Sequence, residues 1–181
     1  MGDTTLSVDE MIQLIAHGEV ANDFETGRIS EDEFLTDAIA RCQLSCDIEK
    51  VRAHLEEIFW PNEDVCNLIP KLAQSHSIYL LSNTNATHAR RFQQDYASTL
   101  GHFDRLFMSH ELGVMKPDSQ IYERVQQEIG LPSESLLFVD DLEANIEAAR
   151  SAGWNGIVYR GIERLKQELK DYEITESGGT G

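Results

Sequence analysis

The side chains best suited to chemistry in this chain are a hydroxyl, an amide, an ammonium and two carboxylates, found in three short stretches. They are Ser82, Asn83, Lys116, Asp140 and Asp141. Carboxylates are preferred ligands of Mg²⁺, while ammonium groups, hydroxyls and backbone amides hold phosphate oxygens. Gathered in one place, these groups would make a site for magnesium and phosphate.

Two apolar segments must position most of these groups. Residues 78–81 run directly into Ser82, and residues 136–139 run directly into Asp140. After the first sixty residues, helical patterns alternate with such short apolar runs, which is typical of a parallel sheet covered by helices on both faces. Open parallel sheets bind ligands outside the carboxyl ends of their strands, so we expect the polar ends of the two segments to lie together.

The remaining segments of the α/β region complete this pattern. Further strands are expected at residues 103–108 and 156–159, and helices at residues 63–74 and 117–130. Pro117 suits a first helical position, and Gly130 suits a helix end. Because the residue before a proline avoids helical geometry, Lys116 is expected in a turn, from which it can point into a site.

The first sixty residues favour helices alone. Ser30 and Glu33 form a capping-box pattern, in which two side chains satisfy the free amides at a helix start. Other helices are expected from Ser7 and from Ile48. We therefore expect three parts: a helical unit at residues 1–61, an α/β core at residues 62–175 and a tail without order at residues 176–181.

The composition favours a cytoplasmic protein with a small ligand. The chain has 181 residues, 41% of them hydrophobic, which suffices for one main core and a small appendage. Its 32 acidic and 15 basic residues give a formal charge of -17, which disfavours nucleic acid and membranes as partners. Residues 1–10 lack the basic residues of a signal peptide, and no apolar run approaches the roughly 20 residues of a membrane span.

The cysteines predict neither a disulfide framework nor a metal centre. Cys42, Cys46 and Cys66 are an odd number in a cysteine-poor chain. Cys42 and Cys46 suit one helix face, but no histidine pair has the spacing of a zinc site. We interpret all three as ordinary thiols.

Each candidate residue also has a plainly structural interpretation. Lys116 alone suits a solvated surface lysine, and Ser82 alone suits a capping turn. Asp140 and Asp141 suit the N-terminus of the helix that follows them. Taken singly, these interpretations are favoured, but the order of the residues and their places at strand ends favour the site.

The arrangement resembles the haloacid dehalogenase superfamily over about residues 5–165. Residues 78–85, IYLLSNTN, look like its second motif, residues 113–118, GVMKPD, its third, and residues 137–145, LFVDDLEAN, its fourth. Residues 24–30, FETGRIS, are similar to the helical cap of the branch that includes sugar-phosphate phosphatases and the phosphatase domain joined to epoxide hydrolase. The resemblance implies a Rossmannoid parallel sheet flanked by helices, with a small all-helical cap.

The resemblance also implies a role for each candidate residue in the hydrolysis of a small phosphorylated metabolite, expected to be a sugar phosphate. Ser82 and the backbone amide of Asn83 would hold phosphoryl oxygens, and Lys116 would neutralise the phosphate and the nucleophile. Asp141 would be the main side-chain ligand of Mg²⁺, with assistance from Asp140. The cap would exclude water and select the substrate.

One element of the family pattern is missing. The first motif is a buried strand ending in Asp-x-Asp, which supplies the nucleophile and the general acid and base, and it should precede the cap. Residues 1–6, MGDTTL, do not match it, because Met1 stands where the nucleophile belongs and no apolar strand leads in. We therefore expect no turnover from the chain as written. A gene model beginning downstream of the true start would explain the loss.

Two other functions stay open: a catalytically dead binding or regulatory protein and, more weakly, a haloacid dehalogenase. Metal-free dehalogenation does not require the carboxylates of Asp140 and Asp141, and their presence therefore favours a phosphatase.

The missing strand is central in the family's sheet, between residues 78–81 and 136–139, so its loss leaves a slot. Three or four buried aliphatic side chains contribute roughly 1.5 to 3 kcal/mol each, which is comparable to the whole stability of a domain. We expect one of three outcomes: the two neighbouring strands pair, a homodimer forms through strand exchange, or the chain is only marginally folded.

Overall fold

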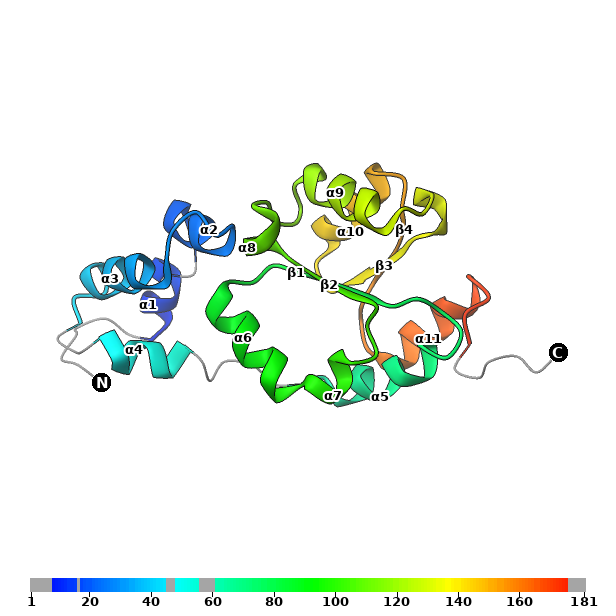
Figure 1. The fold of residues 1–181 in the computed structure, drawn as a ribbon, viewed down its shortest axis with the longest axis horizontal. Coiled ribbons are helices and arrows are strands. Elements are labelled where there is room, and N and C mark those ends of the chain that lie inside the picture. The colour runs from blue at the N-terminus through cyan, green and yellow to red at the C-terminus, as the bar shows by residue number, and fades with distance from the viewer. Residues whose placement is uncertain (1–7, 16, 45–47, 56–60, 176–181) are drawn as a thin grey trace.

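The computed structural model describes residues 8–15, 17–44, 48–55 and 61–175. Its N-terminal part consists of four helices, which lie together at one end of the molecule (Figure 1). They are α1 (Val8–Ile15), α2 (Glu19–Glu25), α3 (Glu31–Arg41) and α4 (Ile48–Leu55). The predicted capping box is present: the Ser30 side chain accepts a hydrogen bond from the Glu33 N–H, and the Glu33 carboxylate accepts one from the Ser30 N–H.

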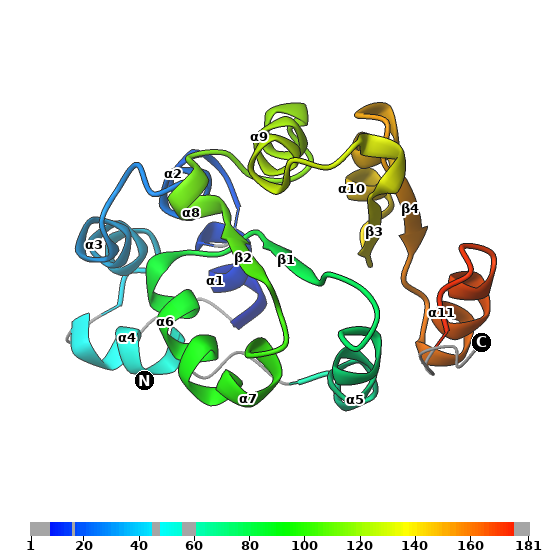
Figure 2. The same cartoon turned by 45° about the vertical axis from the view of Figure 1, so that its right-hand side comes forward.

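The remaining residues form an α/β structure with parallel strands, as predicted. The strands are β1 (Tyr79–Ser82), β2 (Arg105–Met108), β3 (Leu137–Asp140) and β4 (Asn155–Val158). The helices are α5 (Glu63–Leu72), α6 (Ala86–Asp95), α7 (Ala97–Leu100), α8 (Ser109–Leu112), α9 (Ser119–Ile129), α10 (Glu143–Ser151) and α11 (Ile162–Lys170), with a 3-10 turn at Ser133–Ser135. Helices α9 and α10 cover one face of the strands, and α5, α6, α7 and α11 lie on the other (Figures 1 and 2).

The strands form two parallel pairs instead of one sheet. β1 pairs with β2, β3 pairs with β4, and no ladder joins β1 to β3 among the residues that the structure describes. The pairing of the two neighbouring strands, one of the three expected outcomes, is therefore wrong. We call the space between the inner edges of β1 and β3 the slot.

The two faces of the strands are packed differently. On the face of α9 and α10, a single apolar cluster reaches from Tyr79 and Leu81 in β1 to Phe138 in β3. On the opposite face, Leu80 packs in one cluster with residues of α6, whereas Leu137 packs in another with residues of α5 and α11. The hydrophobic core is thus continuous across the slot on one face and divided on the other.

The start of α9 differs from the sequence prediction. Pro117 is not the first residue of a helix, because α9 begins at Ser119 and the Asp118 carboxylate caps it by accepting a hydrogen bond from the Gln120 N–H. Gly130 ends α9 in the left-handed region, as expected. Helices α2 and α11 were not predicted at all.

The helical part touches the α/β part through backbone at very short range. Gly27, in the turn between α2 and α3, has φ of +69°, and a Cβ atom there would lie 2.4 Å from the carbonyl oxygen of His110. Nearby, the buried Ser109 hydroxyl donates to the carbonyl oxygen of Glu25 at 2.7 Å, and Thr87 donates to the carboxylate of Glu31 at 2.6 Å. The close approach at Gly27 therefore depends on the absence of a side chain.

This contact can be tested by comparing Gly27→Ala with Gly130→Ala in urea unfolding. Gly130 has a similar φ of +74° but open space around its Cα. Alanine in left-handed geometry costs roughly 1 to 2 kcal/mol, which is the loss expected for Gly130→Ala. Gly27→Ala should lose more and should also expose residues 17–44 to limited proteolysis. Equal losses with unchanged proteolysis would contradict the close approach.

Candidate functional site

Lys116 occupies the centre of the candidate site. It lies in the turn between α8 and α9, as predicted, and is only 9% exposed, so the interpretation as a solvated surface lysine is wrong. Its Nζ donates hydrogen bonds to the carbonyl oxygen of Leu81 at 2.9 Å and to Oδ2 of Asp140 at 2.7 Å. One ammonium therefore connects the carboxyl ends of β1 and β3.

Asn83 fixes the turn that carries this lysine. Its Nδ2 donates to the carbonyl oxygen of Lys116, and its Oδ1 accepts from the backbone N–H of Lys116, both at 2.8 Å. The family resemblance implied a role only for the backbone amide of Asn83. The sequence carries no local signal for the side-chain contact, because its partner lies 33 residues away.

Asp140 is the anionic partner of Lys116. Its side chain is 7% exposed, and its Oδ1 accepts from the Leu142 N–H and from Nδ2 of Asn145, both at 2.9 Å. Burial alone would raise the pKa of Asp140, but the hydrogen bond and charge of Lys116, with the bonds from Leu142 and Asn145, outweigh burial and lower it. The carboxylate is therefore held in its ionised form.

Two buried residues that the sequence did not indicate support Asp140. Asn145 is 3% exposed, and its backbone carbonyl accepts a 2.7 Å hydrogen bond from the hydroxyl of the fully buried Tyr122. Burial, and then the negative charge of Asp140, raise the pKa of Tyr122, which keeps its hydroxyl a donor. A chain of contacts thus runs from Tyr122 through Asn145 and Asp140 to Lys116.

Asp141 and Ser82 lie at the same two strand ends but make fewer hydrogen bonds than Asp140 and Asn83. Asp141 follows β3, is exposed, and contacts Arg160 through its backbone carbonyl. Ser82 is half-buried, and its hydroxyl makes a long 3.4 Å hydrogen bond to the carbonyl oxygen of Asn83. Asn85, and not Ser82, caps α6, because Oδ1 of Asn85 accepts from the N–H of His88.

The residues at these strand ends fit a magnesium ion that is completed by other ligands. No group of three metal-ligating side chains gathers among the described residues. Mg²⁺ commonly takes only one or two carboxylates from the protein, with water and phosphate as further ligands. Asp141 presents an exposed carboxylate for this role, while three donors already engage Asp140.

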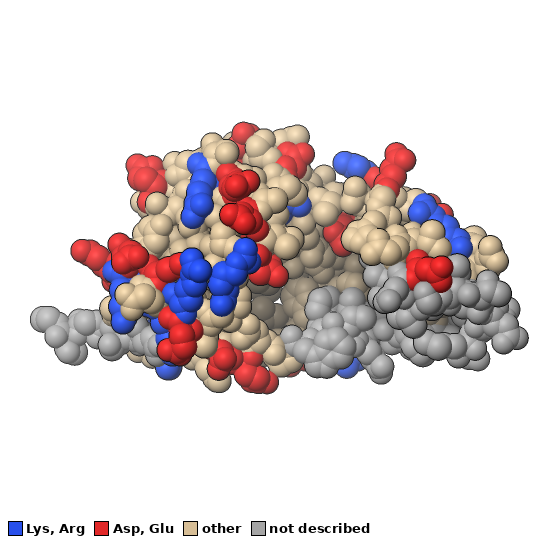
Figure 3. Space-filling view, turned by 180° about the vertical axis from the view of Figure 1, so that it is seen from behind, with Lys and Arg blue, Asp and Glu red and all other residues tan. Residues whose placement is uncertain are grey.

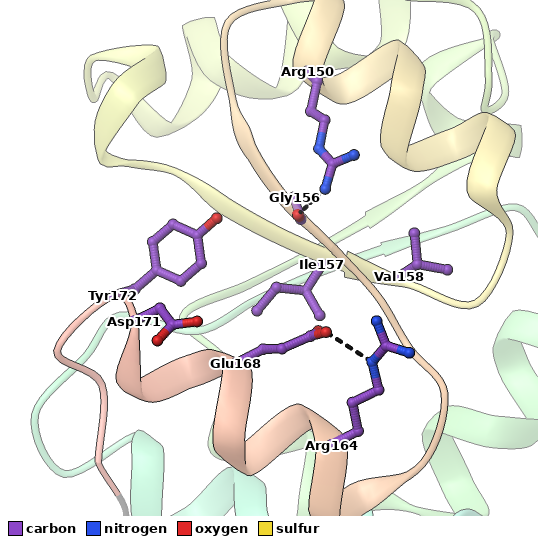
Figure 4. A pocket seen from close by; sticks show the side chains of 8 residues that line it. All are labelled: Arg150, Gly156, Ile157, Val158, Arg164, Glu168, Asp171 and Tyr172. Carbon is purple, nitrogen blue, oxygen red and sulfur yellow. Dashed lines mark hydrogen bonds and ion pairs between the residues drawn. The ribbon is translucent and has the colours of Figure 1, made fainter.

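A separate groove of about 480 Å³ lies beside β4 and α11 (Figure 4). Three of its charged side chains are bonded to neighbours: Arg164 to Glu168 at 2.8 Å, and Arg150 to the carbonyl oxygen of Gly156 at 2.7 Å. None of the predicted site residues lines this groove. The groove is therefore separate from the candidate site at the strand ends.

Parallel strands with helices on both faces, and a lysine and a carboxylate at their carboxyl ends, define an α/β fold with a polar site at its strand ends. The family model described as haloacid dehalogenase-like hydrolase matches residues 3–153. The chain belongs to this family.

Similar proteins include two enzymes of known name. A D-ribitol-5-phosphate phosphatase from Bacteroides thetaiotaomicron is 30% identical over 83% of this chain and 76% of its own length. The drimenol cyclase drtB from Aspergillus calidoustus is 27% identical over 84% of this chain, but the chain spans only 30% of that protein. Among solved structures, the HAD family enzyme bt-2542 of Bacteroides thetaiotaomicron, in complex with magnesium and inorganic phosphate, has a TM-score of 0.72. The two are 22% identical, and the match covers 84% of this chain and 79% of that one.

The lowered pKa of Asp140 predicts how stability depends on pH. A carboxyl group with a lowered pKa in the folded state stabilises above its unfolded pKa, near 3.8, and this contribution is lost as pH falls through the folded value. The free energy of unfolding should therefore fall below about pH 4, and Asp140→Asn should flatten this slope and lower stability at neutral pH.

The control for this measurement is Asp141→Asn, which removes the neighbouring exposed carboxylate. Its unfolding curve should keep the steep acid dependence of the unchanged chain. Removing one partner of a buried ion pair costs about 3 to 5 kcal/mol, and Lys116→Met should show a loss of that size. If Asp140→Asn and Asp141→Asn behave alike, the Lys116–Asp140 pair does not have the stabilising role assigned to it.

Proposed function

We propose that this chain carries the phosphate and magnesium site of a haloacid dehalogenase-like phosphohydrolase for small phosphate monoesters, with a sugar phosphate as the expected class. The observation that carries the proposal is the Lys116 ammonium, buried and bonded at once to the ends of β1 and β3. The similarity to a D-ribitol-5-phosphate phosphatase supports the substrate class.

Each residue contributes a distinct part of phosphate binding. The Lys116 ammonium supplies positive charge, and the Ser82 hydroxyl and the Asn83 backbone N–H supply donors to phosphoryl oxygens. Asp141 would hold Mg²⁺, with Asp140 fixed behind it by Lys116. When bound, Mg²⁺ neutralises charge that develops on the transferring phosphoryl group. Positioning and electrostatic stabilisation account for most of the catalysis of phosphoryl transfer. These residues would therefore supply the larger part of the rate enhancement, and the nucleophile the smaller part.

The same geometry supports the proposal that the chain alone does not turn over substrate. Among the described residues, Asp140 is the only acid bonded to Lys116, and its oxygens are taken by three donors. It is therefore poorly placed as an attacking group. Residues 1–6 lie outside the described residues.

A catalytically dead relative that binds phosphate is the second candidate function. It is favoured by the same retained elements, since Lys116, Asn83 and Asp140 are held by contacts that need no attacking group.

Partners other than a small metabolite are disfavoured by charge. The net charge is -17, and acidic and basic side chains are interspersed on the face shown in Figure 3. Within the part that the structure describes, none of the helices has the length and apolar character of a membrane span. We keep the cytoplasm as the expected location and small phosphorylated molecules as the expected ligands.

A combined binding and activity measurement tests the proposed function. With Mg²⁺ and inorganic phosphate, the chain should melt at a higher temperature, because a ligand that binds only the folded state stabilises it. Asp141→Asn should lose most of this shift. With D-ribitol 5-phosphate or a generic phosphate ester, turnover should not exceed that of Asp141→Asn, because loss of a covalent nucleophile costs about 10⁴ to 10⁶ in rate.

The possible results test different parts of the proposal. An unchanged melting temperature at millimolar Mg²⁺ and phosphate would contradict the proposed binding site. Clear magnesium-dependent turnover would overturn the proposed lack of a nucleophile. Adding a strand that ends in Asp-x-Asp before the helical part should create activity in a phosphohydrolase, and it should create none in a dead relative.

A further inference from the structure

A second cationic side chain, Arg160, lies at the edge that carries the candidate site. It directly follows Tyr159, whose N–H donates to the carbonyl oxygen of Asp140 at 2.8 Å just beyond the end of β4. Nη1 of Arg160 donates to the carbonyl oxygen of Asp141, also at 2.8 Å. The guanidinium therefore lies beside the two aspartates of the site, next to the residue that is proposed to hold Mg²⁺.

Several donors of this guanidinium remain for a ligand. Nη1 lies 3.4 Å from the carbonyl oxygen of Tyr159, and Nη2 lies 3.9 Å from the carboxylate of Glu143. The side chains of Arg160 and Glu143 are 47% and 69% exposed, and so long an ion pair between exposed groups contributes little. Nε has no partner among the described residues. A guanidinium carries more N–H groups than these contacts use, so an anion can still bind to it.

The charges around the strand ends make Arg160 important for an anionic ligand. It is the only lysine or arginine among the residues that directly follow the four described strands. These are residues 83–85, 109–111, 141–143 and 159–161. The charge of Lys116 is offset by the buried carboxylate of Asp140, while Asp141 and Glu143 add negative charge that repels an anion. Apart from a bound Mg²⁺, Arg160 is therefore the main source of attraction for a further anionic group at this edge.

The two cations are separated by the pair of aspartates. Lys116 reaches the carbonyl oxygen of Leu81 and so lies on the side of β1, whereas Arg160 follows β4, which pairs with the other edge of β3 (Figure 2). A phosphoryl group held by Lys116 and Ser82 would lie on the β1 side. Arg160 therefore suits a second anionic group at the far end of the same small molecule.

We propose that Arg160 binds a second anionic group of the ligand, so that the site prefers sugar phosphates that also carry a carboxylate or a further phosphate. The planar guanidinium presents paired N–H groups that match two oxygens of either group. The inference rests on the proposed function, because Lys116, Ser82 and Asp141 have to hold the first phosphate and Mg²⁺. It narrows the expected substrate class from any sugar phosphate to those with two anionic ends.

Three related ligands test this preference on the whole chain in the presence of Mg²⁺. D-Ribitol 5-phosphate has one anionic end, D-ribonate 5-phosphate adds a carboxylate at the other end, and D-ribitol 1,5-bisphosphate adds a phosphate there. Isothermal titration calorimetry should show about tenfold tighter binding of at least one doubly anionic ligand, which is the factor that a hydrogen bond to a charged group contributes. The tighter of the two shows which anion Arg160 prefers.

A set of variants separates a direct contact from a structural role. Arg160→Gln removes the charge, so it should abolish the advantage of the doubly anionic ligands and change the binding of D-ribitol 5-phosphate far less. Arg160→Lys keeps the charge without the paired geometry and should retain part of the advantage. Arg164→Gln is the matched control, because it removes an exposed guanidinium that is bonded to Glu168 in the separate groove. The control should keep the whole advantage.

The affinity for Mg²⁺ alone gives a readout in which the two roles have opposite signs. Loss of a positive charge beside a cation site should leave Mg²⁺ binding unchanged or make it tighter. If Arg160 only positions the backbone of Asp141, Arg160→Gln should instead weaken the binding of Mg²⁺ and of all three ligands by the same factor.

That uniform loss would overturn the inference, as would equal binding of the three ligands by the unchanged chain or an advantage that survives in Arg160→Gln. Binding of D-ribitol 5-phosphate with no gain from a second anion would contradict this inference alone. If neither D-ribitol 5-phosphate nor inorganic phosphate binds in the presence of Mg²⁺, both this inference and the proposed function are wrong.

Discussion

The buried ion pair between Lys116 and Asp140 is the interaction on which the arrangement of the strand ends depends. Burying a charged pair is costly unless further hydrogen bonds satisfy both groups. Here the carbonyl oxygen of Leu81 accepts from the ammonium, and Leu142 and Asn145 donate to the carboxylate. Because Leu81 and Asp140 lie in different strand pairs, these bonds also hold the two pairs together.

In the proposed site the same residues would serve both structure and chemistry, and this limits the contacts that each of them can make. A phosphate group near Lys116 has to share an ammonium that already has two acceptors. Asp140 is held too firmly for a role that needs it to move, whereas the exposed Asp141 is not. The two adjacent aspartates therefore differ in their contacts: Asp140 positions the lysine, and Asp141 is exposed, as the proposed metal ligand has to be.

The parts of this arrangement that the sequence predicts are those with local signals. The apolar runs before Ser82 and Asp140 marked two strands, the proline after Lys116 marked its turn, and Ser30 with Glu33 marked a helix start. Each depends on the geometry of a few neighbouring residues. The placement of the carboxyl ends of β1 and β3 at one edge followed from the general behaviour of parallel sheets.

The contacts that sequence analysis missed join residues far apart in the chain. The Asn83 side chain pairs with the backbone of Lys116, 33 residues away, and nothing near Asn83 indicates its partner. Helix α11 was missed because its charged residues dominate the segment, although Leu165 and Leu169 are buried. The domain division at residue 61 also remains a prediction.

The unequal packing of the two faces shows how the two strand pairs stay together although no ladder joins them among the described residues. On the α9 and α10 face, the rings of Tyr122, Phe138 and Trp154 meet edge to face with centroids 5.5 to 6.1 Å apart. Such aromatic contacts add stability beyond the burial of area, and this cluster also includes Tyr79 and Leu81 of β1. It therefore connects the pairs through side chains, and Lys116 connects them at the carboxyl end. On the other face, the described residues of the two strand pairs belong to separate apolar clusters, and Val139 is 36% exposed there.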